Sequence, residues 1–199
     1  DDVIDILKHY NVEYIVEDKS NHGRQLDVTF KGILRKEQQT AMSCMLPHNI
    51  GTLSATTAFG KTVFAIAMIA ERKVNTLILV HRKSLLDQWK NHLENFLEIN
   101  EVVVNDGKKR MSKKQQSPIG TLYSGKNSIH GIIDIALIQS CFDGNEVSPF
   151  VENYGMVIVD ECHHVSSVSF EQVLRKVKAK YVYGLTATPI RKDGHQPII

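Results

Sequence analysis

Two short stretches of this sequence carry residue types that can bind phosphate groups and a divalent cation together. Residues 55–62 read Ala-Thr-Thr-Ala-Phe-Gly-Lys-Thr, and later in the chain the pair Asp160 and Glu161 directly follows the apolar run 156–159. An ammonium, a hydroxyl and free backbone N–H groups suit phosphate oxygens, whereas carboxylates suit Mg²⁺. The order of the two stretches makes a site for ATP with Mg²⁺ the leading hypothesis.

The first stretch is close to the phosphate-loop pattern Gly-x-x-x-x-Gly-Lys-Ser/Thr. Lys61 is expected to reach the β- and γ-phosphates, and the Thr62 hydroxyl is expected to ligate Mg²⁺. Gly60 permits a close backbone approach that a side chain would block. The sequence departs from the pattern at Ala55, which stands where the first glycine is expected, and Ala58 occupies another position that is often glycine. An ordinary tight turn before a helix is the alternative interpretation.

The second stretch places two carboxylates at the end of an apolar run. Residues 156–159 read Met-Val-Ile-Val, which predicts a buried strand ending at the edge where α/β sheets bind ligands. Asp160 is expected to hold Mg²⁺ through water, and Glu161 to orient and deprotonate the attacking water. A solvent-facing acidic turn is the alternative. The following Cys162-His163 could suggest zinc, but the sequence shows no second Cys/His pair at a workable spacing, so the zinc interpretation is disfavoured.

The elements that must position these residues alternate along the chain. We predict strands at 52–55, 76–80, 119–123, 132–138, 156–159 and 181–185, and helices at 61–72, 84–97 and 170–177. The strands are continuously apolar rather than alternating, which is typical of a parallel sheet covered on both faces. We expect the 156–159 strand to be central and to lie beside the strand that precedes the phosphate loop.

Composition limits the classes of protein to which the chain can belong. Its 199 residues, 42% of them hydrophobic, suffice for one sizeable core. The net charge of +2 argues neither for nor against a polyanionic partner. Three scattered cysteines predict a reducing, cytoplasmic environment without disulfides. No apolar stretch is long enough to span a bilayer, so no membrane partner is expected.

Two segments stand apart from this pattern. Residues 1–30 are interpreted as a leader or as the edge of a preceding domain, with the main domain at 31–199. The missing initiator Met suggests a piece of a longer protein. Residues 105–117 are polar and basic, which favours a flexible loop that the fold does not need. A contact of this loop with nucleic acid is the alternative, although no aromatic residue interleaves its basic residues.

Several blocks, in a fixed order, carry a resemblance to a known family. The segment 160–163, Asp-Glu-Cys-His, resembles the DExH box of superfamily-two helicases and translocases. The blocks at 34–41, 80–85, 135–140 and 184–189 are similar to the adenine-recognition segment, motif Ia, a nucleic-acid-contacting turn and motif III of that family. Together they cover residues from about 30 to about 195 and point to the branch of XPB-like helicases and restriction-enzyme translocating subunits.

The resemblance implies a role for each matching residue. It assigns nucleotide contacts to Arg35, Gln38, Thr57, Ala58, Phe59, Gly60, Lys61 and Thr62, coupling to His163, Thr186 and Thr188, and nucleic-acid contacts to His81, Arg82, Gln139 and Ser140. Each has a plainer alternative. Gln38 could lie on an exposed helix, the two threonines could merely end a strand before proline, and Arg82 could belong to a helix-start surface.

The resemblance also implies a fold and a function. The fold is an α/β, RecA-like P-loop domain with a mostly parallel central sheet and helices on both faces. Its function is that of the first of two such domains in a motor that couples Mg-ATP hydrolysis to movement on DNA or RNA. A second RecA-like domain of the same polypeptide supplies arginine to the γ-phosphate, so this piece alone is expected to be weak or inactive. The alternatives are a translocase subunit that does not unwind, and a catalytically silent binding module.

Overall fold

The computed structural model describes residues 2–103, 117–162 and 168–187. The coupling residues His163 and Thr188 and nearly all of the basic loop at 105–117 lie outside the described residues. Within them, no helix is both long and apolar enough to cross a bilayer.

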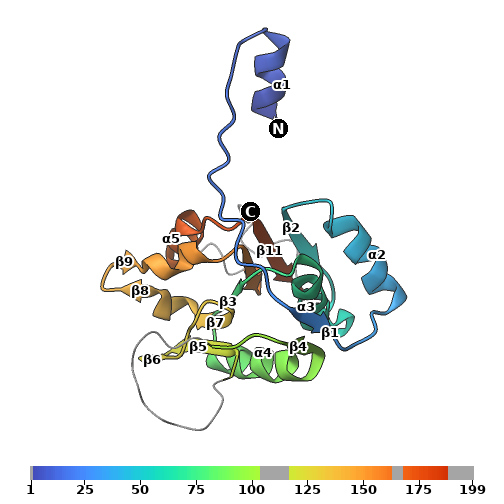
Figure 1. Cartoon of the computed structure of the whole chain (residues 1–199), viewed down its shortest axis with the longest axis vertical. Coiled ribbons are helices and arrows are strands. Elements are labelled where there is room, and N and C mark those ends of the chain that lie inside the picture. Colours follow the sequence, from blue (N-terminus) through green and yellow to red (C-terminus); the bar gives the residue numbers. More distant parts are fainter. Residues whose placement is uncertain (1, 104–116, 163–167, 188–199) are drawn as a thin grey trace.

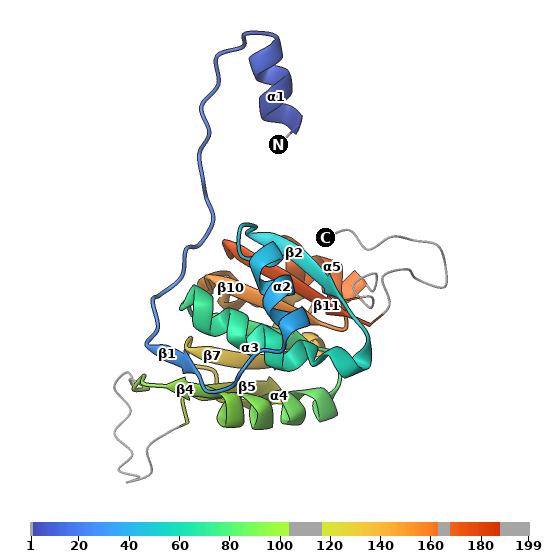
Figure 2. The ribbon, with the colours of Figure 1, turned by 90° about the vertical axis from the view of Figure 1, so that its right-hand side faces the viewer.

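Seven described strands form the central sheet, which is shown in Figures 1 and 2. Their order across the sheet is β2 (Ile50–Ser54), β11 (Tyr181–Thr186), β10 (Met156–Asp160), β3 (Thr76–Val80), β7 (Ile133–Leu137), β5 (Ile119–Tyr123) and β6 (Lys126–Asn127). All neighbours pair in parallel except β5 and β6. The predicted mostly parallel sheet is therefore confirmed, and the predicted strands match to within a few residues.

Helices cover both faces of the sheet because its central strands are apolar on both faces. Every residue of β3 and of β10 is buried. On one face lie α2 (Lys36–Met45), α3 (Lys61–Arg72) and α4 (Lys83–Phe96), and on the other lie α5 (Val168–Lys176) and the short helices η2 (Ile138–Cys141) and η3 (Pro149–Asn153). Helix α3 is buried continuously from Phe64 to Ala70, as its uniformly apolar sequence predicts.

One expectation about strand order is wrong. β10 is central, but its neighbours are β11 and β3, and β2 pairs with β11 instead. Adjacency is not required physically, because parallel strands all end at the same edge of the sheet. The loop after β2 crosses the end of β11, where the Ala55 N–H donates to the Thr186 carbonyl at 3.0 Å.

The N-terminal thirty residues divide into two parts. Helix α1 (Asp2–His9) stands apart from the sheet in both views. Farther along, β1 (Val28–Phe30) pairs with β4 (Leu97–Ile99), and Leu26 and Val28 belong to the core. The second part of the predicted leader is thus packed against the domain, and the boundary at residue 30 stays a prediction.

A glycine pair holds this N-terminal segment against the sheet. A Cβ on Gly23 would lie 2.6 Å from the Gly155 Cα, so the two backbones can approach this closely only without side chains.

The remaining described strands, β8 (Phe142–Asp143) and β9 (Glu146–Val147), form a small hairpin beside the main sheet.

Candidate nucleotide site

The loop between β2 and α3 has the geometry of an anion cradle. After β2 the chain passes through the short helix η1 (Thr57–Phe59) and enters α3 at Gly60, whose φ of 77° is left-handed. A Cβ at Gly60 would meet the Gln38 Nε2 at 3.0 Å. Among the described residues, no side chain caps the start of α3, so the first N–H groups of the helix are available to an anion.

The ammonium of Lys61 lies across this loop. Its Nζ donates to the carbonyl of Ala55 at 2.8 Å and to that of Thr56 at 3.2 Å. Ala55, the departure from the usual pattern, packs its side chain against the apolar core. The loop therefore accommodates the methyl group of Ala55 in place of the usual glycine by packing it on the core. The ammonium of Lys61 still lies at the start of α3.

The two residues assigned to adenine recognition are tied to the same loop. The Arg35 guanidinium donates to the carbonyls of Ala58, at 3.0 Å, and of Phe59. The Gln38 amide donates to the Phe59 carbonyl at 2.8 Å and accepts from the Arg35 N–H at 2.9 Å. Gln38 is only 3% exposed, so the exposed-helix alternative for it is wrong.

Asp160 ends β10 as a buried carboxylate rather than on a solvent-facing turn. It is 7% exposed, and its oxygens accept the Glu161 N–H at 3.0 Å and the Trp89 indole N–H at 2.8 Å. Burial raises the pKa of Asp160, the Trp89 bond opposes that shift, and the Lys61 charge also lowers the pKa by a smaller amount. Lys61 is the first residue of α3 and Asp160 is the last residue of β10, so both lie at the carboxyl edge of the sheet.

Glu161 has an unusual backbone for a residue with a side chain. Its φ of 53° lies in the left-handed region, which costs on the order of 1–3 kcal/mol and which Asn11, Lys73 and Ser124 also adopt. Because this turn ends the extended backbone right after Asp160, the Glu161 side chain does not continue the strand's alternation.

The remaining nucleotide-site residues lie around the same edge. Thr62 is the second residue of α3, and Thr186 ends β11 with only 2% exposure. Among the described residues, no group of three or more His, Cys, Asp or Glu could hold a metal. Mg²⁺ typically binds through one or two carboxylates together with substrate phosphates, so Thr62 and Asp160 fit a cation that arrives with a nucleotide.

The four residues assigned to nucleic acid lie at the ends of two neighbouring strands. His81 and Arg82 follow β3, and Gln139 and Ser140 follow β7 in η2. Since β3 and β7 pair in parallel up to Val80 and Leu137, all four lie at the carboxyl edge. Arg82 and Gln139 are exposed. The helix-start alternative for Arg82, the N-cap residue of α4, stays open.

Sequence reasoning missed one residue of the site, Trp89. The predicted helix at 84–97 contains it, but no role in the site was assigned to it, and its indole N–H donates to Asp160. One signal could have indicated its role: a buried tryptophan usually has a hydrogen-bond acceptor for its N–H.

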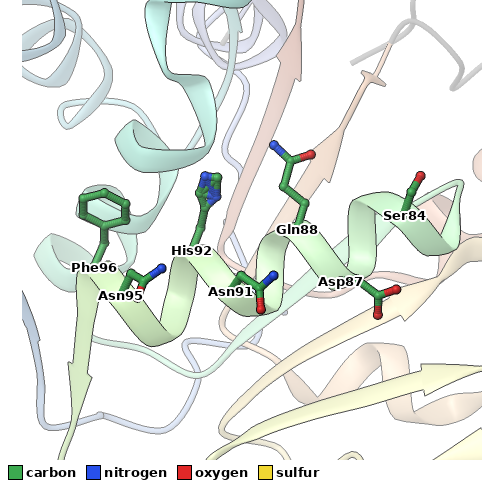
Figure 3. Close-up of a pocket in the computed structure, with 7 residues that line it drawn as sticks. All are labelled: Ser84, Asp87, Gln88, Asn91, His92, Asn95 and Phe96. Atoms are coloured by element: carbon green, nitrogen blue, oxygen red, sulfur yellow. The ribbon is translucent and has the colours of Figure 1, made fainter.

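A hollow elsewhere on α4 does not compete with the loop as a site. Figure 3 shows it along the outer side of the helix, where it is lined by Ser84, Asp87, Gln88, Asn91, His92, Asn95 and Phe96. All of these come from one helix, and most are exposed. Binding sites are usually concave and have polar groups converging from several elements, which describes the loop rather than this hollow.

The fold and the site define a class of protein. A phosphate loop, an acid pair and a parallel sheet meeting at one edge make this a P-loop nucleotide-binding domain of the RecA-like type. Residues 31–191 match the family model described as "Type III restriction enzyme, res subunit", and the chain belongs to this family.

Individual relatives agree with this assignment. The chain is 35% identical over 173 residues to the 109L protein of Invertebrate iridescent virus 3, whose name calls it a candidate helicase, covering 83% of this chain and 48% of that protein. It is 28% identical over 161 residues to the DNA 3'-5' translocase XPB2 of Sulfurisphaera tokodaii, covering 81% and 32%. The chain thus spans about half, or less, of these relatives' length.

Solved structures agree on the fold. The UvsW helicase of bacteriophage T4 matches 94% of this chain and 70% of its own, with a TM-score of 0.61 at 12% identity. The SWI2/SNF2 ATPase core of Sulfolobus solfataricus, solved with dsDNA, matches 80% of this chain and 33% of its own, with a TM-score of 0.55 at 19% identity. The resemblance to the first RecA-like domain of superfamily-two helicases and translocases is confirmed by these matches together.

Proposed function

We propose that this domain is the ATP-binding half of a motor that couples Mg-ATP hydrolysis to movement on nucleic acid. The observation that carries the proposal is the placement of Lys61, at the start of α3, and of Asp160, at the end of β10, on the same carboxyl edge of the sheet. Family membership supports it, and several relatives are named as helicases or translocases.

The side chains then have distinct tasks. Lys61 and the first N–H groups of α3 bind phosphate oxygens, with the ammonium exchanging its bonds to the Ala55 and Thr56 carbonyls for bonds to the nucleotide. Thr62 and Asp160 would hold Mg²⁺, which supplies positive charge to the reacting phosphate when bound. Glu161 orients the attacking water and accepts its proton.

The partners belong to the same proposal. Arg82, Gln139 and their neighbours would contact the backbone of DNA or RNA, as supported by the neighbour solved with dsDNA. A second RecA-like domain would complete the ATP site, which is supported by relatives more than twice as long as the matched region. His163 and Thr188 would join Thr186 in coupling the two sites. A reducing, cytoplasmic environment accords with three free cysteines.

A translocase that does not separate strands is a second candidate. The observation that favours it is the match to a relative named as a DNA 3'-5' translocase. A strand-displacement assay beside an ATPase assay separates the two candidates, because a pure translocase hydrolyses ATP on duplex DNA without releasing a strand.

Two substitutions in the full-length protein test the proposed roles. Glu161→Gln keeps the shape of the side chain but cannot accept a proton, so turnover should fall by about 100-fold or more while nucleotide affinity is retained. Lys61→Ala should instead weaken nucleotide binding, because it removes a cation that contacts ground-state phosphates. The measurements are steady-state hydrolysis with nucleic acid and nucleotide affinity.

Gln88→Ala, on the exposed side of α4, is the control and should change neither quantity. Hydrolysis by Glu161→Gln at the wild-type rate would show that this glutamate is not the base. The 199-residue chain alone should show negligible stimulation by nucleic acid, and robust turnover by it would contradict the need for a second domain.

A further inference from the structure

The inner face of α4 carries the only tryptophan of the chain, Trp89. Its side chain is 1% exposed, and its indole N–H donates to Asp160 Oδ2 at 2.8 Å. A bond from a buried donor to a carboxylate is shorter and stronger than one between neutral groups. An apolar side chain would fill the same core volume, so the N–H adds something that packing does not require.

The two bonds that Asp160 accepts define the orientation of its carboxylate. Within the described residues, Oδ2 accepts from Trp89 and Oδ1 accepts from the Glu161 N–H, so each oxygen has one donor there. A carboxylate oxygen can accept two hydrogen bonds, so each oxygen of Asp160 can make one further contact, with a cation or with a water bound to that cation. Rotating the carboxylate would break both bonds, and the group is therefore held ready in one orientation.

The position of Trp89 links this carboxylate to the candidate nucleic-acid edge. Helix α4 begins at Lys83, directly after His81 and Arg82 at the end of β3. Trp89 lies about two helical turns farther along the same helix. A helix moves as a rigid unit, so a displacement of its first turn also moves the indole that orients Asp160.

We propose that Trp89 is a positioning residue: its indole N–H holds Asp160 in the orientation needed for Mg²⁺ and transmits movement of α4 to the nucleotide site. This proposal rests on the proposed function for the identity of the cation and of the nucleic-acid edge. It assigns no chemical step to Trp89, because the indole contacts only the carboxylate that would hold the metal.

The decisive experiment removes the N–H while preserving the shape of the side chain. In the full-length protein, Trp89 is replaced by 3-benzothienylalanine, in which sulfur takes the place of the N–H, and separately by Phe. Loss of such a supporting bond typically costs about 10–100-fold in metal affinity or activity. We expect the Mg²⁺ concentration for half-maximal hydrolysis to rise about 10-fold, and stimulation by DNA to fall, while nucleotide binding without metal is unchanged.

Leu93→Met provides the matched control. Leu93 is fully buried one turn farther along α4, and methionine has nearly the same volume, so only packing is perturbed. This variant should keep the wild-type Mg²⁺ dependence. A benzothienylalanine variant with wild-type Mg²⁺ dependence would overturn the positioning role, and unchanged stimulation by DNA would overturn the transmission role.

A second readout does not depend on activity. The indole N–H signal of Trp89, identified in ¹⁵N spectra by its disappearance in Trp89→Phe, should exchange slowly with solvent in the wild type. In Asp160→Asn it should shift, because the bond passes to a neutral acceptor, and in Asp160→Ala it should exchange at least about 10-fold faster. An unchanged signal in both variants would contradict the bond itself. If the wild-type protein did not hydrolyse ATP, the proposed function would be contradicted. The spectrum would still test whether the Trp89 indole N–H binds Asp160.

Discussion

Two buried aspartates, at opposite ends of the same sheet, have very different surroundings. Asp134 is the second residue of β7, near the amino edge, and is fully buried. It accepts the Gly131 N–H at 2.7 Å, the Tyr154 hydroxyl at 2.7 Å and, more weakly, the His130 N–H. Asp160 ends β10 at the carboxyl edge and accepts from two donors in the part of the chain that the structure describes. The comparison indicates that a carboxylate enclosed by protein donors has a structural role. A carboxylate at the carboxyl edge that can still accept hydrogen bonds or bind a cation instead belongs to a ligand-binding site.

The neighbours of Asp134 show how completely the amino edge is closed. The Asn75 side chain accepts from the Arg24 and Gly155 N–H groups and donates to the Gly131 and Asn153 carbonyls. Burial raises the pKa of the Tyr154 hydroxyl, and the Asp134 charge raises it further, so this hydroxyl remains a donor. Most polar groups at this edge therefore satisfy one another; the exception among the described residues is the buried Nδ1 of His130, which has no hydrogen-bond partner.

The largest expected difference comes from making the same substitution at both positions. Asp134→Asn turns one acceptor into a donor that faces the Gly131 N–H and the Tyr154 hydroxyl, and breaking such a buried network should cost about 3 kcal/mol of unfolding free energy. In Asp160→Asn the amide oxygen can still accept from Trp89, the only bond lost among the described residues is that from the Glu161 N–H, and a charge whose burial is unfavourable is removed. Its unfolding free energy should change by less than about 1 kcal/mol.

Urea unfolding of the two variants measures these free energies. Mg²⁺-dependent hydrolysis by the full-length protein should rank the two variants in the opposite order, with Asp160→Asn the more strongly affected. Asp160→Asn should be folded and inactive, because a neutral amide is a poor ligand for Mg²⁺. Equal destabilisation by both substitutions would contradict the distinction between a structural and a functional carboxylate.

A smaller effect is expected at the partner of Asp134. Tyr154→Phe removes one donor and leaves the other donors of Asp134 in place, so it should cost about 1–2 kcal/mol. In the double variant with Asp134→Asn the costs should not add, because both substitutions remove the same bond. Urea unfolding of the two single variants and the double variant measures this coupling, and simple additivity would show that the bond contributes nothing.

The comparison also explains how far the sequence could predict the structure. Unbroken apolar runs such as β3 and β10 predict buried parallel strands because no other environment suits them. Their ends locate the carboxyl edge, and with it the acid pair. Local patterns do not determine which strands are neighbours, and the wrong placement of β10 beside β2 followed from the need to bring Asp160 near Lys61, which strands that are not adjacent can also meet.

Hydrogen bonds between side chains that are far apart along the chain also could not be predicted from the sequence. The bonds from Gln38 to the loop and from Trp89 to Asp160 join residues 21 and 71 positions apart. A buried tryptophan predicts an acceptor without naming it. The polar closure around Asp134 was not anticipated, because an aspartate within an apolar run gives no local sign of its partners.

The smallest effect concerns the three cysteines, whose reactivity reports on how often the core opens. Burial raises the pKa of Cys162, beside the acid pair, to about 11, and that of Cys141, in η2, to about 12, whereas Cys44 is exposed on α2. Since the thiolate is the reactive form, iodoacetamide at about pH 8 should label Cys44 alone in the native protein. Cys44→Ser should abolish this labelling. Peptide mass mapping should find Cys141 and Cys162 labelled faster in Asp134→Asn, which unfolds more often, but not in Asp160→Asn. Equal protection in both variants would indicate that closure of the amino edge does not limit opening of the core.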